Sequence, residues 1–462
     1  MSSHYRTSVT EEQEREEISQ HLTQQLETFL QPLLTWLDAY LDRRLVRTFL
    51  LSLAAIVTFR HHKQGLYLSE LGSYLLQAVH APAGTKRLSR LLHCEKWGKA
   101  LIERFLWEHA QNNVEQMEQA GEEVLCIWDG SVIEKPESER TEGLCAVRSS
   151  KARRLKKQRK GNWNPQGGKA ITVLGIEWTA LLVLGMKYLP TVATMQWWSR
   201  KGENATSQRE VEKQVLLQVA SRWGRRVLHV FDRGYASKGW IALLSLFHLR
   251  FVIRWKKGHV FFDQKGQEKK LWEIARGKRS WQQREVWDER KKCWCKMGVL
   301  ALPLRHAGYG GALWMVIGRR KGEPWYLITN ECIEIAEQAW HIIFVYARRW
   351  QIELTFRYGK SELAMESPRM RKAEEREKLL LMVTLVYAYL LSLIDPMREK
   401  IKIWLLRHYC HRTGKRCQQA KLPLYRLRWA LSRFWQQYPP VFTSTLLKNH
   451  PEDSNMRSES SG

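Results

Sequence analysis

The chain has 462 residues, 44% of them hydrophobic, which is enough to bury a sizeable core and excludes a protein disordered throughout. Lys and Arg number 75 against 47 Asp and Glu, giving a formal net charge of +28 at pH 7. This excess predicts a polyanionic partner, with nucleic acid favoured over an anionic membrane. Eight cysteines without a disulfide rhythm suit a reducing cytoplasm, and the N-terminus lacks the apolar segment of a signal peptide.

Residues 1–120 are predicted to form a helical N-terminal region. Apolar residues recur at helical spacing over 18–41. Residues 84–92 form a short amphipathic helix with three cations, which either lies on a DNA backbone or is a solvated basic face. We expect this region to bind DNA ends.

Residues 121–255 are predicted to form an α/β sheet. Apolar strands at 124–128 and 226–231 each end at an aspartate, Asp129 and Asp232. Carboxylates that follow buried strands project from the C-terminal edge of a sheet, where α/β sites form. The alternative for each is an ordinary Asp that caps the following turn.

Between these two strands we expect a hairpin and a helix. The hairpin strands are predicted at 170–176 and 180–187, separated by residues 177–179, and the helix at 210–223.

Residues 256–330 change to short strands, turns and cations, which predicts a β-rich insertion. Helical spacing resumes over 331–395, and a basic helical region with a disordered tail is expected over 396–462. The longest apolar run, 379–394, is shorter than the roughly 20 residues that span a bilayer, so we expect a buried helix and no membrane partner.

Four polar residues near position 350 share one helical stripe. Tyr346, Arg349, Glu353 and Lys360 are spaced 3, 4 and 7 apart, which places them at roughly 0°, −60°, −20° and −40° around an α-helix. A carboxylate among a phenol, a guanidinium and an ammonium could hold a metal ion and grip phosphates beside it. The alternative is a helix on which Arg349 or Lys360 merely pairs with Glu353.

The three carboxylates Asp129, Asp232 and Glu353 could converge on two Mg²⁺ ions, for which Mn²⁺ could substitute. Such a pair of ions activates an attacking oxygen and stabilises a leaving one at phosphorus. We predict Asp129, Asp232 and Glu353 as both the catalytic and the metal-binding residues.

These motifs resemble those of bacterial insertion-sequence transposases of the DDE superfamily, in the group marked by Y-x2-R-x3-E-x6-K (the insertion-sequence "four" family). Tyr346, Arg349, Glu353 and Lys360 match that signature without a gap. The segments beginning at Asp129 and Asp232, and residues 325–330, resemble the blocks that accompany it. The resemblance covers roughly residues 85–395.

The resemblance implies an α/β fold with an RNase H-like core, interrupted by the β-rich insertion between the second and third catalytic carboxylates and flanked by helical N- and C-terminal regions. It also implies that Tyr346, Arg349 and Lys360 hold phosphates next to the cut, and that Trp325 receives a base that leaves the stack. Further DNA contacts are expected from Arg233 and from a cationic loop that contains Arg153, Arg154, Lys156 and Lys157.

The expected function is cut-and-paste transposition of an insertion sequence by a cytoplasmic, nucleoid-associated bacterial enzyme. Its expected partners are double-stranded DNA, as terminal inverted repeats and target, and a second copy of the chain in a synaptic complex. One alternative is another RNase H-fold nuclease such as a resolvase, which would not need the Tyr/Arg/Lys stripe. The other is a non-catalytic DNA-binding protein derived from a transposase, which could lose any carboxylate. Two groups could suggest zinc: Cys293 with Cys295, and His408, Cys410, His411 and Cys417. Neither contains a paired C-x2-C arrangement, so structural zinc is not favoured.

Overall fold

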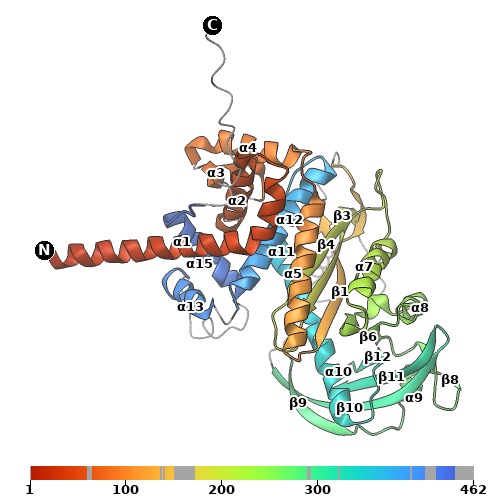
Figure 1. Cartoon of the computed structure of the whole chain (residues 1–462). Helices are drawn as coiled ribbons and strands as arrows, with labels where there is room; N and C mark the ends of the chain where they lie inside the picture. Colours follow the sequence, from red (N-terminus) through yellow and green to blue (C-terminus); the bar gives the residue numbers. More distant parts are fainter. Residues whose placement is uncertain are drawn as a thin grey trace, which may run out of the picture. The chain divides into compact units, whose positions relative to one another are not determined.

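The computed structural model (Figure 1) describes residues 2–59, 65–76, 78–135, 138, 141–149, 172–288, 293–320, 323–395, 398–410 and 423–442, with side chains from residue 11. The chain divides into two compact units. Unit 1 comprises Met1–Leu106, Arg140–Glu142 and Tyr358–Gly462, and unit 2 comprises Trp107–Glu139 and Gly143–Arg357.

Unit 1 is built from helices in the part of it that the structure describes. They are α1 (Ser2–Asp38), α2 (Arg43–Thr58), α3 (Leu68–Leu76), the short 3-10 helix η1 (Ala78–His80), α4 (Ala81–His93), the start of α5 (Lys99–Gln119), α12 (Ala373–Ser392), α13 (Glu399–His408) and α15 (Leu424–Gln437). The helical periods expected over 18–41 and 84–92 therefore correspond to parts of α1 and α4.

The longest apolar run, residues 379–394, forms a buried helix as predicted. Every residue of α12 from Leu379 to Leu391 is buried. Nearby, the buried Arg428 donates to the carbonyl oxygen of Phe59 at 2.7 Å and also to that of Glu362, so its charge is compensated by backbone dipoles at the ends of other segments. No helix among the described residues is long and apolar enough to cross a membrane.

Unit 2 contains a twelve-stranded sheet with the order β2-β3-β1-β5-β6-β12-β11-β10-β7-β8, in which β4 also pairs with β3 and β9 with β10. Its first half consists of β1 (Val124–Glu134), β2 (Cys145–Arg148), β3 (Thr172–Leu184), β4 (Thr191–Trp198), β5 (Val227–Phe231) and β6 (Arg250–Trp255). Its second half consists of β7 (Val260–Phe262), β8 (Glu268–Lys270), β9 (Gln282–Asp288), β10 (Cys293–His306), β11 (Tyr309–Arg320) and β12 (Trp325–Thr329).

The parallel strands of the sheet all lie in its first half, and an antiparallel pair joins this half to the second. Strand β1 is parallel to β5, and β5 is parallel to β6, whereas β3 is antiparallel to β1 and β12 is antiparallel to β6. The β-rich segment that follows β6 therefore continues the same sheet instead of forming a separate one.

The predicted hairpin split at residues 177–179 is wrong. Residues on both sides of it belong to the single strand β3, which pairs with β1 through Trp178 and Thr179. These positions contain no turn-forming residue, and Trp178 is buried. The hairpin turn lies instead between β3 and β4, where the sequence has Gly185 and Pro190.

Helices cover both faces of the sheet. The second half of α5, α7 (Gln208–Arg222) and α8 (Lys238–Leu246) pack in one core with Trp128 and Phe231. On the other face, α10 (Ala336–Arg348) places Ile343 against Gly318, and α11 (Trp350–Ser361) places Phe356 edge-on to Trp178 at 4.7 Å.

Arg250, the first residue of β6, joins three segments at the end of the sheet where the parallel strands begin. Its guanidinium donates to Glu123, just before β1, at 2.6 Å and to Glu331, just after β12, at 2.8 Å. His341 of α10 lies 2.6 Å from the other oxygen of Glu123, and this hydrogen bond raises the pKa of His341. The network fixes the ends of strands that are far apart in sequence.

Because the folded-state pKa of His341 is raised, its contribution to stability is fully present below the unfolded pKa of about 6.5 and is lost as pH rises through the folded value. The side chain is 44% exposed, so solvent screens the pair. We expect His341→Gln to lower the free energy of unfolding by about 0.5 kcal/mol at pH 5.5 and by less at pH 8.5. Urea unfolding at both pH values measures this, with His80→Gln in unit 1 as control. A loss that is equal at both pH values would contradict it.

Candidate catalytic site

Asp129 and Asp232 lie side by side at the C-terminal ends of two parallel strands. The register of β1 and β5 pairs Ile127 with Val230, so two residues further along each strand Asp129 stands level with Asp232. Adjacent strands are about 4.8 Å apart. Side chains alternate along a strand, so both aspartates lie on the face opposite Trp128, the face that α10 and α11 cover.

The prediction that the first strand ends at Asp129 is wrong. β1 continues to Glu134 because β3 pairs with it on its other side, and only the parallel pairing with β5 stops, at Ile127. The apolar run marks where β1 is buried on both sides, which is why it ends earlier than the strand itself.

Each aspartate also caps its own turn, which was the alternative interpretation. Oδ1 of Asp129 accepts from the N–H of Gly130 at 2.8 Å, and Oδ1 of Asp232 accepts from the N–H of Gly234 at 2.6 Å. One oxygen of each carboxylate is thereby fixed by local backbone, and the second oxygen is left for another partner. Capping and a functional role are therefore compatible here.

The stripe of polar residues crosses two helices instead of one. Tyr346 lies in the last turn of α10, Glu353 lies on α11, and Arg349 occupies the turn between the two helices. The N–H of Arg349 bonds to the carbonyl of Tyr346 at 3.1 Å, a three-residue closure that is tighter than an α-helix. The predicted positions around one helix depend on 3.6 residues per turn throughout, and the backbone departs from that geometry at Arg349.

Arg349 joins two carboxylates from distant parts of the chain. Its Nη1 donates to Oδ2 of Asp129 at 3.1 Å, and its Nη2 donates to Oε1 of Glu353. The side chain is 14% exposed. Burial would lower the pKa of Arg349, but Tyr346, Asp129 and Glu353 outweigh it and raise the pKa. In this structure Arg349 thus forms the ion pair with Glu353 that the sequence left as an alternative, and it adds Asp129.

Negative charge at this site exceeds what Arg349 compensates. The pKa of Asp129 is raised to about 7, first by burial and then by the neighbouring Asp232, although Arg349 acts in the opposite direction. Carboxylate oxygens are the ligands that Mg²⁺ prefers, and a divalent cation would relieve this repulsion, so the donor set fits such an ion.

The positions of the carboxylates nevertheless differ from those of an assembled metal centre. Among the described residues, no three His, Cys, Asp or Glu side chains are grouped closely enough to hold one ion. The guanidinium of Arg349 occupies the space between two of the three carboxylates, so a metal ion would compete with it for Asp129 and Glu353.

Trp325, the first residue of β12, belongs to the same neighbourhood. Its ring lies 5.1 Å from that of Tyr346 in an edge-on arrangement, and the guanidinium of Arg320 lies 4.8 Å from its centroid. One face of the indole therefore carries a cation, and a base that stacked on that face would meet Arg320.

Arg233 and Arg254 share one exposed carboxylate next to Asp232. Glu323 accepts from Arg233 at 3.2 Å and from Arg254 at 3.4 Å, and its side chain is 61% exposed. Burial raises the pKa of Tyr346, while Arg349 and a hydrogen bond from Arg254 act against it. The sequence predicted Arg233 but missed Arg254, because a lone cation inside an apolar strand carries no motif.

The remaining predicted residues lie either in unit 1 or outside the described part of the chain. Lys360 lies on α11 after the chain has passed into unit 1, so its role stays a prediction. The cationic loop residues Arg153, Arg154, Lys156 and Lys157 fall outside the part of the chain that the structure describes.

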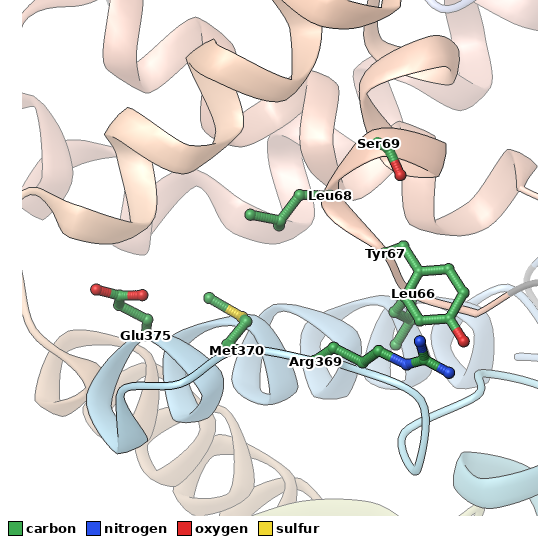
Figure 2. A pocket seen from close by; sticks show the side chains of 7 residues that line it. All are labelled: Leu66, Tyr67, Leu68, Ser69, Arg369, Met370 and Glu375. Carbon is green, nitrogen blue, oxygen red and sulfur yellow. The ribbon is translucent and has the colours of Figure 1, made fainter. Parts of the chain in front are cut away.

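Unit 1 contains a separate hollow of about 310 Å³, shown in Figure 2. Tyr67 stands at one end, where the guanidinium of Arg369 faces its ring at 4.9 Å from the centroid, and the buried Glu375 stands at the other end. The carboxylate of Glu375 lies 3.1 Å from His93, and none of the predicted site residues lines the hollow. Its chemistry does not point to phosphate transfer.

Part of the chain is similar to known transposases. Residues 203–389 match the family model described as the transposase DDE domain, a segment that contains Asp232 and Glu353 but begins after Asp129. The matched segment covers less than half of the chain, and this segment is similar to the DDE domain of transposases. Among curated proteins, none matches the sequence. One similar solved structure is a piggyBac transposase synaptic complex with hairpin DNA; it is 11% identical, and the match covers 91% of this chain and 78% of that one with a TM-score of 0.40.

The charge imbalance at Asp129 predicts a stability gain when the charge is removed. Because the folded pKa of Asp129 is raised, the folded protein favours the neutral carboxyl. Its contribution to the free energy of unfolding is fully present below the unfolded pKa of about 3.9 and is lost as pH rises through about 7. In the presence of a chelator, Asp129→Asn should raise the free energy of unfolding by roughly 2 kcal/mol at pH 8 and by little at pH 5.

Thermal unfolding at both pH values measures this effect. Glu134→Gln provides a matched control, because Glu134 is a buried carboxylate of the same strand that accepts from Ser149 at 2.9 Å. Asp129→Asn destabilising the protein at pH 8 would show that the buried charge is fully compensated.

Proposed function

We propose that this protein is a bacterial insertion-sequence transposase that moves DNA by a cut-and-paste route with Mg²⁺. The observation that carries the proposal is the bridge formed by Arg349. Asp129 and Glu353 come from distant segments and meet on one guanidinium, and Asp232 stands on the next strand at the same level. A chance ion pair on a helix surface would not include a carboxylate from an interior strand of the sheet.

An RNase H-like core is part of the proposal. Its support is the order β4-β3-β1-β5-β6, with β3 antiparallel to β1 and with β1, β5 and β6 parallel. The strands β7 to β12 would then be the insertion between the second and third carboxylates.

Asp129, Asp232 and Glu353 would hold the metal ions, which supply activation of a water or a 3′-hydroxyl and stabilisation of the leaving oxygen. Arg349, once released from a carboxylate, offers a bidentate fork to a DNA phosphate. Tyr346 and Lys360 would grip neighbouring phosphates, and Trp325 would receive an unstacked base, an interaction of about 1–3 kcal/mol per base.

The N-terminal helices would bind the ends of the element through α4. A Cβ atom on Gly84 would lie 2.2 Å from the carbonyl oxygen of Gly72, so α4 meets α3 backbone to backbone and turns its other side outward. That side exposes Lys86, Arg87 and Arg90, which form no ion pair with a described residue. Two protomers would join both ends in one synapse.

The first test is strand cleavage. A duplex carrying the inverted repeats that flank the gene should be nicked by the wild type with Mg²⁺ or Mn²⁺. Asp129→Asn, Asp232→Asn and Glu353→Gln should each lower the rate at least about 10³-fold, because a metal ligand is lost, while DNA binding persists. The rate is measured on end-labelled DNA, with Glu134→Gln as the control. Cutting that survives any of the three substitutions rules out the triad.

The second test concerns the basic side of α4. The triple variant Lys86→Ala, Arg87→Ala, Arg90→Ala should bind the same duplex more weakly, and the slope of log K against log salt should fall by about 3 if each cation meets a phosphate. Fluorescence anisotropy at several salt concentrations measures both quantities.

The matched control replaces Arg43, Arg44 and Arg47, three exposed cations of α2, by alanine. An equal loss in both triple variants would mean that net charge, and not the surface of α4, governs binding.

A further inference from the structure

A buried polar cluster lies behind the two aspartates, on the side of the sheet that α7 covers. Glu212 of α7 is 2% exposed, and Oε1 of its carboxylate accepts from Gln208 at 2.7 Å. The buried hydroxyl of Tyr235 forms no direct hydrogen bond with a described residue, and the carboxylate of Glu212 is the charge that acts on it most strongly, ahead of Asp129 and Asp232. None of these three side chains takes part in the chemistry proposed above.

The cluster reaches both turns that carry the aspartates. Tyr235 ends the short 3-10 helix η3 (Arg233–Tyr235), which Asp232 caps. Its ring is held between Phe231 at 5.0 Å and Trp240 at 5.3 Å. On the other side, Nε2 of Gln208 lies 3.6 Å from the position that a Cβ atom would take on Gly130, the residue after Asp129.

We propose that Glu212 is a positioning residue that, through Tyr235 and Gln208, holds the turns of Asp232 and Asp129 in one fixed relation. This inference rests on the proposed function, because the relation matters only if the two aspartates act together. Glu212 does not contact the reacting atoms and is not a catalytic residue.

The burial of Glu212 is evidence against a role in packing alone. A carboxylate removed from water is less favourable than an apolar side chain of the same size unless its hydrogen bonds are needed. The first turn of α7 could have packed on Tyr235 with a leucine. The carboxylate instead accepts from Gln208 through Oε1, lies 4.0 Å from Arg209 through Oε2, and acts on the hydroxyl of Tyr235, which an apolar residue cannot do.

The test uses Glu212→Gln, Tyr235→Phe and the double variant, all close to isosteric. The first readout is amide hydrogen exchange of residues 129–131 and 232–236 in the full-length protein with a chelator present. The second is the affinity for Mn²⁺ alone, measured by titration calorimetry. Glu134→Gln is the matched control, as a buried carboxylate of β1 whose partner is Ser149.

We expect faster exchange in both turns and about tenfold weaker Mn²⁺ binding in each single variant, as for other groups that orient metal ligands. The double variant should lose no more than the stronger single variant, because the two side chains act through one contact. Glu134→Gln should change neither readout.

Wild-type exchange rates in the two turns of the single variants would overturn the inference, and so would additive losses in the double variant. If the wild-type protein bound no Mn²⁺ and cut no DNA, the proposed function would fail. The exchange measurement alone would then decide whether Glu212 holds the turns.

Discussion

The guanidinium of Arg349 is the interaction on which the candidate site depends. It brings a carboxylate of the interior strand β1 and a carboxylate of the helix α11 to the same cation, in partly buried surroundings where each charge alone would be costly. Attraction between opposite charges is several times stronger here than in water. Removing Arg349 would leave Asp129, Asp232 and Glu353 to repel one another without compensation.

One cation is nevertheless too little for three acids. Burial and the neighbouring Asp232 raise the pKa of Asp129 to about 7 even with Arg349 in place, so ionising this carboxyl is only partly compensated at neutral pH. Proteins tolerate such imbalance mainly where function requires it, because substitution by neutral residues would be more stable. The imbalance suits a site that exchanges one guanidinium for doubly charged ions and then offers that guanidinium to a phosphate.

Sequence patterns predicted the parts of this structure that depend on local burial. The apolar runs before Asp129 and Asp232 located β1 and β5, and the apolar period of 379–394 located α12. The single strand β3 was divided in error because Glu177 and Thr179 interrupt its apolar run, although their cross-strand neighbours keep them extended. The break at Arg349 could not be predicted either, since one residue with a shorter hydrogen bond leaves the spacing of polar residues almost unchanged.

Contacts between distant segments were beyond the reach of local patterns. Arg254, Glu323 and Glu212 have no motif of their own, and their partners are set by strand order. β12 returns antiparallel to β6, so its first residue, Trp325, lies at the end of the sheet where β6 finishes and where Asp232 follows β5. A long insertion thus delivers the indole of Trp325 and the cation of Arg320 to the end of the sheet that carries the aspartates. The direction of one strand pairing accomplishes this, and it depends on the tertiary fold instead of on any short stretch of sequence.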